Sequence, residues 1–329
     1  MLKPTGPISA GVFAVLVALL AGCACPPESP QPEPRRNLST MPTSTTGELR
    51  IRDPFLLFVP DENCYYLFGT NDVKQHDPKC KVGFDCYRSS DLTHWNGPAP
   101  AFRPDADFWA TQDYWAPEVY PYRGKYYMFA TFKSPERRRG TQVLIADWPE
   151  GPYRPWSDGP VTPADWECLD GTLYRAKDGT PWIVFCHEWL QITDGAICAM
   201  PLTDDLRSAA GEPITLFHAS EAPWARAQQN QVFVTDGPFL IEADGRLFML
   251  WSSFGDEGYA MGIAESADGS ITGPWRQHAE PLYAGNGGHG MIFRTADGGR
   301  QVAIHSPNTP PQERLLIFPL PLDKLTGQP

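Results

Sequence analysis

Five short motifs built on a carboxylate, or in one case a histidine, recur along the chain ahead of strand-like segments. They read RDPFL from Arg52, APEVY from Ala116, LDGTL from Leu169, TDGPF from Thr235 and HGMIF from His289. Their anchors, Asp53, Pro117, Asp170, Asp236 and His289, are 64, 53, 66 and 53 residues apart. When a unit of similar size is repeated around a circle, the starts of all the repeats meet at one centre. Three Asp carboxylates and Glu118 would then face each other, which suits acid–base hydrolysis of a sugar bond.

Inverting glycoside hydrolysis needs two carboxyl groups on opposite sides of the sugar. One activates water, and the other, protonated, donates to the leaving oxygen at a separation of roughly 6.5–9.5 Å. A third carboxylate nearby raises the pKa of the acid by like-charge repulsion. A single Asp before Gly or Pro is more simply a turn residue that caps backbone amides. Three Asp residues at the starts of equivalent repeats favour a catalytic site.

The segments that follow the motifs indicate how the carboxylates are positioned. After each motif come an apolar strand, a tight turn and an aromatic strand, and several turns contain Asp-Gly or a relative that supplies the positive φ of a hairpin. No stretch shows helical periodicity over several turns. Five blocks of short strands predict an all-β fold, a five-bladed β-propeller. Because the order of the elements repeats, a β-sandwich with coincidental turns is disfavoured.

In a propeller, the first strand of each blade starts at one mouth of the central channel, and the second strand ends there. The predicted second strands end at Thr70-Asn71, Thr131-Phe132, His187-Glu188-Trp189, Ser252-Ser253-Phe254 and His305-Ser306. We therefore expect substrate contacts from both sets, and the candidates are Glu118, Trp115, His187, Trp189, Ser253 and His289. Trp115 and Trp189 adjoin motif residues and offer flat faces to a sugar ring. Most other aromatic residues alternate along strands and fit blade packing.

The motifs, in this order and at this spacing, resemble those of glycoside hydrolase family 43, from about residue 48 to the end. The resemblance rests on Arg52-Asp53-Pro54, Trp115-Ala116-Pro117-Glu118, Leu169-Asp170-Gly171, Asp236-Gly237-Pro238 with Trp251-Ser252-Ser253-Phe254, and Gly287-Gly288-His289-Gly290. It implies a glycosidase that inverts configuration, with Asp53 as general base, Asp170 tuning the pKa of the acid, and Asp236 at the position of the general acid. His289 resembles a channel histidine that supports a hydrated calcium ion in many members. The chemistry itself would need no cofactor.

The sequence departs from this family at the acid. Members usually carry Glu, in Glu-Gly-Pro or Glu-Ala-Pro, where this chain has Asp236. Asp is one methylene shorter, and displacing a proton donor by about an ångström can cost on the order of a hundredfold in rate. Glu188, at the end of the second strand of the Asp170 repeat, is an equal candidate for the acid. It is alternatively a partner for His187 or an arginine.

The substrates implied by the resemblance are furanosides or pentose-type sugars. We rank α-L-arabinofuranosides first, β-D-galactofuranosides second and β-xylosides third. A surface glycan-binding propeller without catalysis is the main alternative, because the usual Glu is absent at Asp236. A fructoside-active propeller hydrolase that uses an Asp nucleophile and retains configuration is another.

The N-terminus predicts export. Lys3 precedes an apolar run from Ala10 to Ala21, and Leu20-Ala21-Gly22-Cys23 resembles a lipoprotein signal whose lipidated cysteine becomes the mature N-terminus. An ordinary secretory signal beside a cysteine is the alternative. We expect residues 1–23 to be the signal, 24–48 a Pro/Ser/Thr-rich tether and 49–329 the catalytic propeller. The protein would be secreted across the inner membrane and lipid-anchored, in the periplasm or at the cell surface.

Charge and cysteines limit the partners. A formal net charge of -12 argues against nucleic acid, and we expect a monomer that binds an oligo- or polysaccharide. If Cys23 carries lipid, seven of the eight cysteines remain. A cross-strand disulfide between Cys186 and Cys198, and another within Cys64, Cys80 and Cys86, are plausible outside the cell. No Cys-x-x-Cys pair suggests a zinc site.

Overall fold

The computed structural model describes residues 1–2, 6, 34–70 and 82–326. It divides the chain into two units, Met1–Pro32 and Glu33–Pro329, and only the second is considered below. Cys23, most of the predicted signal segment, the first part of the predicted tether and Cys80 lie outside the described residues. Within the described ranges, no helix is long and apolar enough to cross a membrane.

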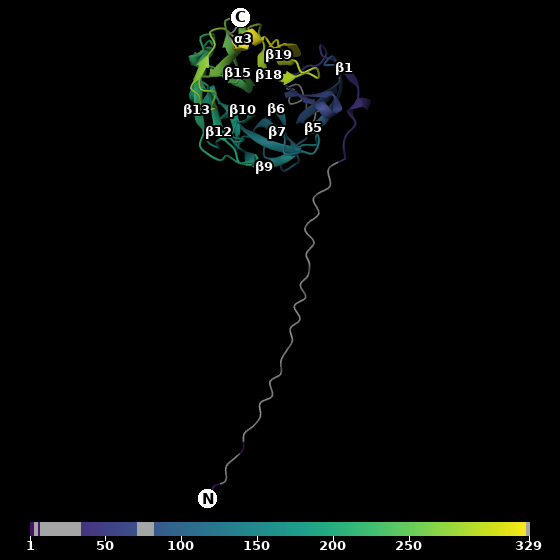
Figure 1. Cartoon of the computed structure of the whole chain (residues 1–329), viewed down its shortest axis with the longest axis vertical. Helices are drawn as coiled ribbons and strands as arrows, with labels where there is room; N and C mark the ends of the chain where they lie inside the picture. Colours follow the sequence, from purple (N-terminus) through teal and green to yellow (C-terminus); the bar gives the residue numbers. More distant parts are fainter. Residues whose placement is uncertain (3–5, 7–33, 71–81, 327–329) are drawn as a thin grey trace. The chain divides into compact units, whose positions relative to one another are not determined.

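The second unit consists of five antiparallel sheets arranged radially around a common centre (Figure 1). We number these blades I to V in chain order. Blade I contains β1 (Thr43–Thr45), β2 (Arg52–Val59), β3 (Cys64–Thr70), β4 (Phe84–Ser89) and β5 (His94–Phe102). Blade II contains β6 (Gln112–Tyr122), β7 (Lys125–Lys133), β8 (Gly140–Ala146) and β9 (Arg154–Pro160). Blade III contains β10 (Cys168–Arg175), β11 (Pro181–His187), β12 (Ala196–Pro201) and β13 (Ile214–His218).

Blade IV contains β14 (Asp236–Ala243), β15 (Arg246–Gly255), β16 (Gly258–Ser266) and β17 (Trp275–Gln277). Blade V contains β18 (Gly288–Arg294), β19 (Arg300–Ser306) and β20 (Arg314–Pro319). Short helices are α2 (Trp189–Ile192), α3 (Leu322–Thr326) and the 3-10 turns η1 (Leu38–Thr40), η2 (Pro60–Glu62), η3 (Ala219–Glu221) and η4 (Gln229–Gln231). The first strands contact each other in the cyclic order β2, β6, β10, β14, β18 and back to β2. The predicted five-bladed propeller is therefore confirmed.

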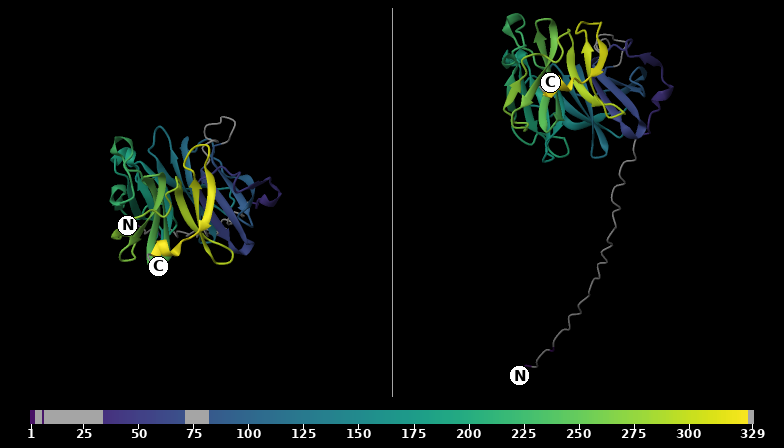
Figure 2. Two further views of the ribbon diagram at one scale, coloured as in Figure 1. Left: turned by 90° about the horizontal axis from the view of Figure 1, so that it is seen from above. Right: turned by 45° about the horizontal axis from the view of Figure 1, so that its top comes forward.

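The strands run from one end of the ring to the other, as the yellow strands β18 and β19 show in the turned views (Figure 2). β1 pairs with β5, and Leu38 is buried in the core. Blade I thus includes residues from the stretch expected to be a tether. The predicted hairpin turns take positive φ, for example at Asp244 (50°) and Gly245 (75°), which matches the twist of two-residue hairpins.

Every first strand is interrupted by a bulge near its start. The strand register shifts between Arg52 and Phe55, Trp115 and Glu118, Leu169 and Thr172, Asp236 and Phe239, and Gly288 and Met291. In each interval one residue is left-handed: Asp53 (φ 49°), Ala116 (44°), Asp170 (55°), Gly237 (49°) and His289 (47°). The anchors aligned from the sequence are therefore wrong by one residue in two blades. The equivalent positions are Ala116 instead of Pro117, and Gly237 instead of Asp236.

A ring of hydrogen bonds holds these bulges. A residue at or near the end of the second strand of one blade accepts a hydrogen bond from the backbone N–H of the left-handed residue in the next blade. The pairs are Thr70 Oγ1 with Ala116 (2.7 Å), Thr131 Oγ1 with Asp170 (2.9 Å), Ser252 Oγ with His289 (2.8 Å) and His305 Nδ1 with Asp53 (3.2 Å). At the equivalent place in blade III stands Cys186, a weak acceptor. There the carboxylate of Asp170 accepts the N–H of Gly237 instead (3.0 Å).

Aromatic second strands pack the blades together, as their alternation predicted: Phe68, Phe129, Phe185 and Phe248 are fully buried. The predicted disulfide between Cys186 and Cys198 is wrong, because both are free cysteines. Cys198 pairs with Phe185 and Cys186 with Ile197. Successive side chains of a strand point to opposite faces, so the two thiols lie in different core clusters. Cys64 and Cys86 are also free and buried.

Candidate active site

A cavity of about 260 Å³ collects three of the predicted carboxylates, Asp53, Asp170 and Asp236. Its lining residues are Arg52, Asp53, Thr70, Trp115, Leu169, Asp170, Trp189, Asp236, Tyr259 and His289. All five first strands contribute, and β3, α2 and β16 supply Thr70, Trp189 and Tyr259. The structure therefore brings first strands of all five repeats together at one cavity.

The bulges explain which residues reach this cavity. Asp53, Asp170 and His289 are left-handed bulge residues, and Trp115 and Asp236 directly precede such residues. Asp170 therefore reaches the cavity from the left-handed position of its bulge, and Asp236 reaches it from the position before. Two consecutive side chains reach the cavity from one strand because the bulge interrupts the alternation of a regular strand.

Three predicted substrate-binding residues lie outside the cavity lining. Glu118 follows its bulge, where it is buried and accepts a hydrogen bond from the Tyr120 hydroxyl (2.5 Å). His187 stacks on Trp166, with ring centroids 4.1 Å apart. Ser253 is fully buried on β15. Trp115, Trp189 and His289 do line the cavity.

Two histidines, an arginine and an alcohol surround Asp53. His289 Nδ1 is 3.2 Å from Asp53 Oδ1 and 3.6 Å from Asp170 Oδ2. Burial by itself would raise the pKa of Asp53, but interactions with His289, Arg52 and His305 and a hydrogen bond with Thr70 outweigh it and hold the pKa at about 2. Burial lowers the pKa of His305 to about 4, so this ring is mainly neutral at pH 7 and accepts from the Asp53 backbone. Asp53 is therefore ionised over the physiological range.

The other two cavity carboxyl groups retain protons to much higher pH. Burial, followed by repulsion from Asp53, raises the pKa of Asp170 to about 8. Burial, followed by repulsion from Asp170, raises the pKa of Asp236 to about 7, although the Tyr259 hydroxyl donates to Asp236 Oδ2 at 2.9 Å and opposes the rise. Carboxyl groups whose environments separate their pKa values in this way can divide the roles of acid and base.

Glu188 has a different environment. It follows β11 and is buried, and its carboxylate pairs with the buried guanidinium of Arg139. Arg139 also binds Asp113 (2.8 Å) and lies 4.4 Å above the ring of Trp115. Burial raises the pKa of Glu188, and Arg139 opposes the rise. Glu188 is not among the residues that line the cavity; it is the arginine partner that the sequence left as an alternative.

The sequence did not single out Arg52, Leu169 and Tyr259 as site residues, although all three line the cavity. Arg52 and Leu169 stand in the quoted motifs, next to Asp53 and Asp170. Tyr259 is the second residue of the third strand of blade IV, a position that a comparison of first and second strands does not consider. Thr70, named as a second-strand end, is found at the cavity.

A calcium ion at His289 would need oxygen ligands, of which Ca²⁺ takes six to eight. The described residues contain no group of three or more His, Cys, Asp or Glu side chains that could hold a metal. The Nδ1 atom of His289 faces the carboxylates of Asp53 and Asp170. The donors present do not form a calcium cage, and a water-mediated ion at His289 stays a prediction.

Comparisons with known proteins agree with this geometry. The chain is 42% identical to a structure of an endo-arabinase from Bacteroides thetaiotaomicron, with a TM-score of 0.78 over 84% of this chain and 96% of that one. It is 22% identical over 207 residues to alpha-L-arabinofuranosidase 43 of Humicola insolens, covering 58% of this chain and 42% of that protein. It is 24% identical over 182 residues to extracellular endo-alpha-(1->5)-L-arabinanase 1 of Bacillus subtilis, covering 50% and 52%. The chain thus spans about half or less of these two curated relatives.

The family itself is shown by a sequence model. The model for glycosyl hydrolases family 43 matches residues 43–317, which include every strand from β1 to β19. The motifs, the propeller and the cavity of carboxylates agree with this match. The chain therefore belongs to family 43 of the glycosyl hydrolases, as the resemblance of its motifs implied.

Proposed function

We propose that the protein hydrolyses α-L-arabinofuranosyl bonds in one inverting step. The observation that carries this proposal is that Asp53 and Asp236 line one cavity in opposite electrostatic environments: the pKa of Asp53 is held at about 2, and burial raises the pKa of Asp236 to about 7, which allows it to carry a proton. A base and an acid in one cavity are what the inverting reaction requires. No covalent intermediate forms.

Each residue would act through its contacts. Asp53 accepts a proton from the attacking water, and His289 and the backbone contact to His305 fix its position. Asp236 donates its proton to the departing oxygen. Tyr259 occupies Oδ2 of Asp236 as a donor, so the acidic proton resides on Oδ1. Asp170 keeps the pKa of Asp236 high, since repulsion between the two carboxyl groups disfavours ionisation.

Asp236 is a better candidate for the acid than Glu188. Asp236 lines the cavity, whereas the carboxylate of Glu188 is directed to Arg139. A buried guanidinium favours the ionised form of its partner, which is unsuited to donating a proton. We assign Glu188 to positioning Arg139 against Trp115.

The choice of sugar is supported by the named relatives, an endo-arabinase, an α-L-arabinofuranosidase and an arabinanase. β-D-galactofuranosides and β-xylosides rank below. The cavity of about 260 Å³ lies near the small end of ligand sites and suits a terminal or single bound sugar. Trp115 and Trp189 offer ring faces at its wall.

Initial rates on aryl glycosides test this function. The panel contains α-L-arabinofuranoside, β-D-galactofuranoside, β-D-xyloside and β-D-fructofuranoside. Each substrate is tested with the wild type and with Asp53→Asn. We expect turnover of the arabinofuranoside that Asp53→Asn abolishes. Turnover of the fructoside alone would refute the assignment. Glycan binding without turnover on the panel or on arabinan would favour the non-catalytic alternative, which the Asp in place of Glu at position 236 supports.

We also propose that Cys23 is lipidated and holds the propeller at a membrane, in the periplasm or at the cell surface. The support is the Leu20-Ala21-Gly22-Cys23 sequence. Metabolic labelling with a fatty acid should mark the wild type, and Cys23→Ser should release a soluble, unlabelled protein. An unlabelled wild-type protein in the medium would show an ordinary secretory signal instead.

A further inference from the structure

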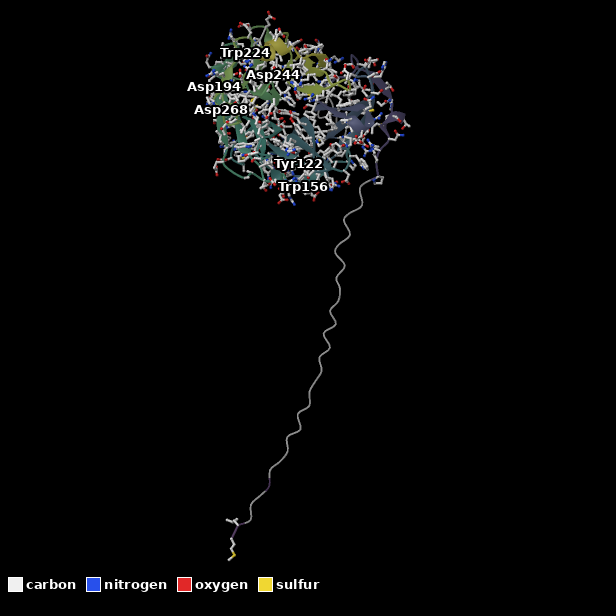
Figure 3. All side chains as sticks on the ribbon, viewed as in Figure 1. Tyr122, Trp156, Asp194, Trp224, Asp244 and Asp268 are labelled. Carbon is white, nitrogen blue, oxygen red and sulfur yellow. The ribbon has the colours of Figure 1, made fainter. Side chains whose placement is uncertain are left out.

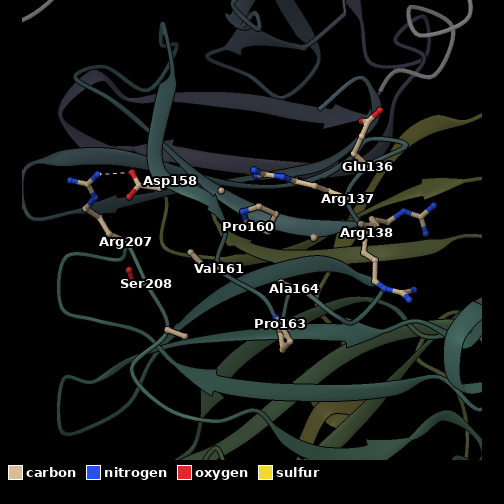
Figure 4. A pocket seen from close by; sticks show the side chains of 14 residues that line it. Glu136, Arg137, Arg138, Asp158, Pro160, Val161, Pro163, Ala164, Arg207 and Ser208 are labelled. Atoms are coloured by element: carbon tan, nitrogen blue, oxygen red, sulfur yellow. Dashed lines mark hydrogen bonds and ion pairs between the residues drawn. The ribbon is translucent and has the colours of Figure 1, made fainter. Parts of the chain in front are cut away.

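A second and larger cavity lies between blades II and III, and its lining shares no residue with the cavity of the catalytic carboxylates. It has a volume of about 780 Å³ and is lined by residues of the β7–β8 loop, the end of β9 and the 207–209 segment (Figure 4). A neighbouring cavity of about 330 Å³ shares Arg137, Asp158 and Arg207 with it. We call the two together the rim groove. The volume of the larger cavity falls within the range of ligand sites and exceeds that of the catalytic cavity.

Two tryptophans line the rim groove. The indole N–H groups of Trp109 and Trp156 are already bonded, to Gln142 Oε1 and to the Asp205 carbonyl (both 2.6 Å). Trp156 lies at the outer edge of the ring (Figure 3). Arg137 lies over Trp109, 5.6 Å from the ring centroid, and Arg207 lies over Trp156 at 4.9 Å. Each tryptophan therefore lines the groove together with a guanidinium that covers one face of its ring, so that an apolar surface and a donor for sugar hydroxyls stand side by side.

The charges of the groove are balanced, although the whole chain carries -12. Its lining contains the bases Arg137, Arg138, Arg139 and Arg207 and the acids Asp105, Asp107, Glu136 and Asp158. The pair Arg207–Asp158 (3.1 Å) has exposed side-chain fractions of 44% and 97%, so water screens it and its stabilisation is small. Such groups can exchange partners with hydroxyls. A balanced set of donors and acceptors fits an uncharged, hydroxyl-rich chain better than a polyanion.

The rim groove adjoins the catalytic cavity through one stacked pair. Arg139 lines the groove, and its guanidinium lies 4.4 Å above Trp115, which lines the catalytic cavity. A polysaccharide held in the groove therefore lies next to the wall of the site that would cleave it. We propose that the rim groove is a non-catalytic binding site for a neutral polysaccharide, the polymeric substrate of the proposed hydrolase. This inference rests on the proposed function for the identity of the polymer.

Binding and kinetics test the proposal with separate readouts. The variants are Arg207→Ala and Trp156→Ala, each also in an Asp53→Asn background for binding to linear arabinan. Arg123→Ala is the matched control, because Arg123 also pairs with an Asp and lies over a tyrosine ring, but lines neither cavity of the groove. We expect Trp156→Ala to weaken arabinan binding about tenfold, Arg207→Ala to weaken it less, and Arg123→Ala to match its parent.

The kinetic readout is the ratio of kcat/KM on arabinan to kcat/KM on the aryl arabinofuranoside. This ratio should fall about tenfold in Trp156→Ala, through KM. Unchanged binding and an unchanged ratio in both groove variants would overturn the proposal. Preferential binding of uronate-bearing polymers that is lost when salt is added would contradict the proposal of a neutral ligand and show that the groove binds an acidic polymer. Arabinan binding that depends on Trp156 without turnover of any glycoside would retain the groove and refute the hydrolase.

Discussion

The Asp170 carboxylate accepts the backbone N–H of Gly237 at 3.0 Å. In the other four blades the equivalent amide donates to a side chain at or near the end of a second strand. In blade III that place is occupied by Cys186, and the carboxylate takes over its role. Asp170 thus has two functions: it fixes the bulge that carries Asp236, and it raises the pKa of Asp236.

Two substitutions separate these functions. Asp170→Asn keeps an acceptor for Gly237 but cannot ionise, so the pKa of Asp236 should fall and the alkaline limb of kcat/KM should move to lower pH. Its melting temperature should stay near that of the wild type. Asp170→Ala should also lose about 1–2 kcal/mol of stability, because the buried amide loses its partner. An alkaline limb that stays in place in Asp170→Asn would contradict the electrostatic function.

Tyr259→Phe should shift the alkaline limb of kcat/KM to higher pH. The hydroxyl of Tyr259 donates to Asp236 and lowers its pKa. Its removal raises that pKa, so the acid keeps its proton, and activity persists, to higher pH. A pH profile of kcat/KM measures the shift, and unchanged melting serves as the control. A limb that moves down would show that another group limits activity at high pH.

Gly237 has a left-handed φ of 49°, and a Cβ added there would lie 2.7 Å from ring atoms of His289. Gly245 is the matched control, since its φ is 75° and a Cβ there meets nothing within 4 Å. Gly245→Ala should cost about 1–2 kcal/mol from backbone strain alone. Gly237→Ala should cost more and reduce kcat, because it displaces His289 from Asp53. Equal losses of stability and activity in the two variants would show that His289 tolerates the shift.

Much of the architecture could be predicted from the sequence, because repeated motifs and turns follow directly from strand periodicity and positive φ. The register of the bulges could not, because the left-handed position holds four different residue types, at Asp53, Ala116, Asp170, Gly237 and His289. Aligning the motifs by residue type therefore misplaced two anchors and directed Glu118 to the cavity. The ends of second strands were expected to meet substrate. Most instead hold the amides of the neighbouring blade, a contact between blades that no local pattern encodes.

The stereochemistry of hydrolysis follows from the proposed roles. With Asp53 activating water, the first product released from an α-L-arabinofuranoside should be the β-anomer. ¹H NMR during the first minutes of a fast reaction resolves it before mutarotation. An α-anomer as first product would show retention, and Asp53 or another carboxylate would then act as a nucleophile.

The central claim, that Asp236 is the general acid, is tested most directly by leaving-group dependence. Asp236→Asn and Glu188→Gln are compared on aryl α-L-arabinofuranosides with good and poor leaving groups. We expect Asp236→Asn to lose on the order of a hundredfold or more in kcat/KM with a phenyl leaving group and little with 2,4-dinitrophenyl, which departs without protonation. Glu188→Gln should change both substrates equally. The reverse pattern, with the leaving-group-dependent loss in Glu188→Gln, would contradict the account and make Glu188 the acid.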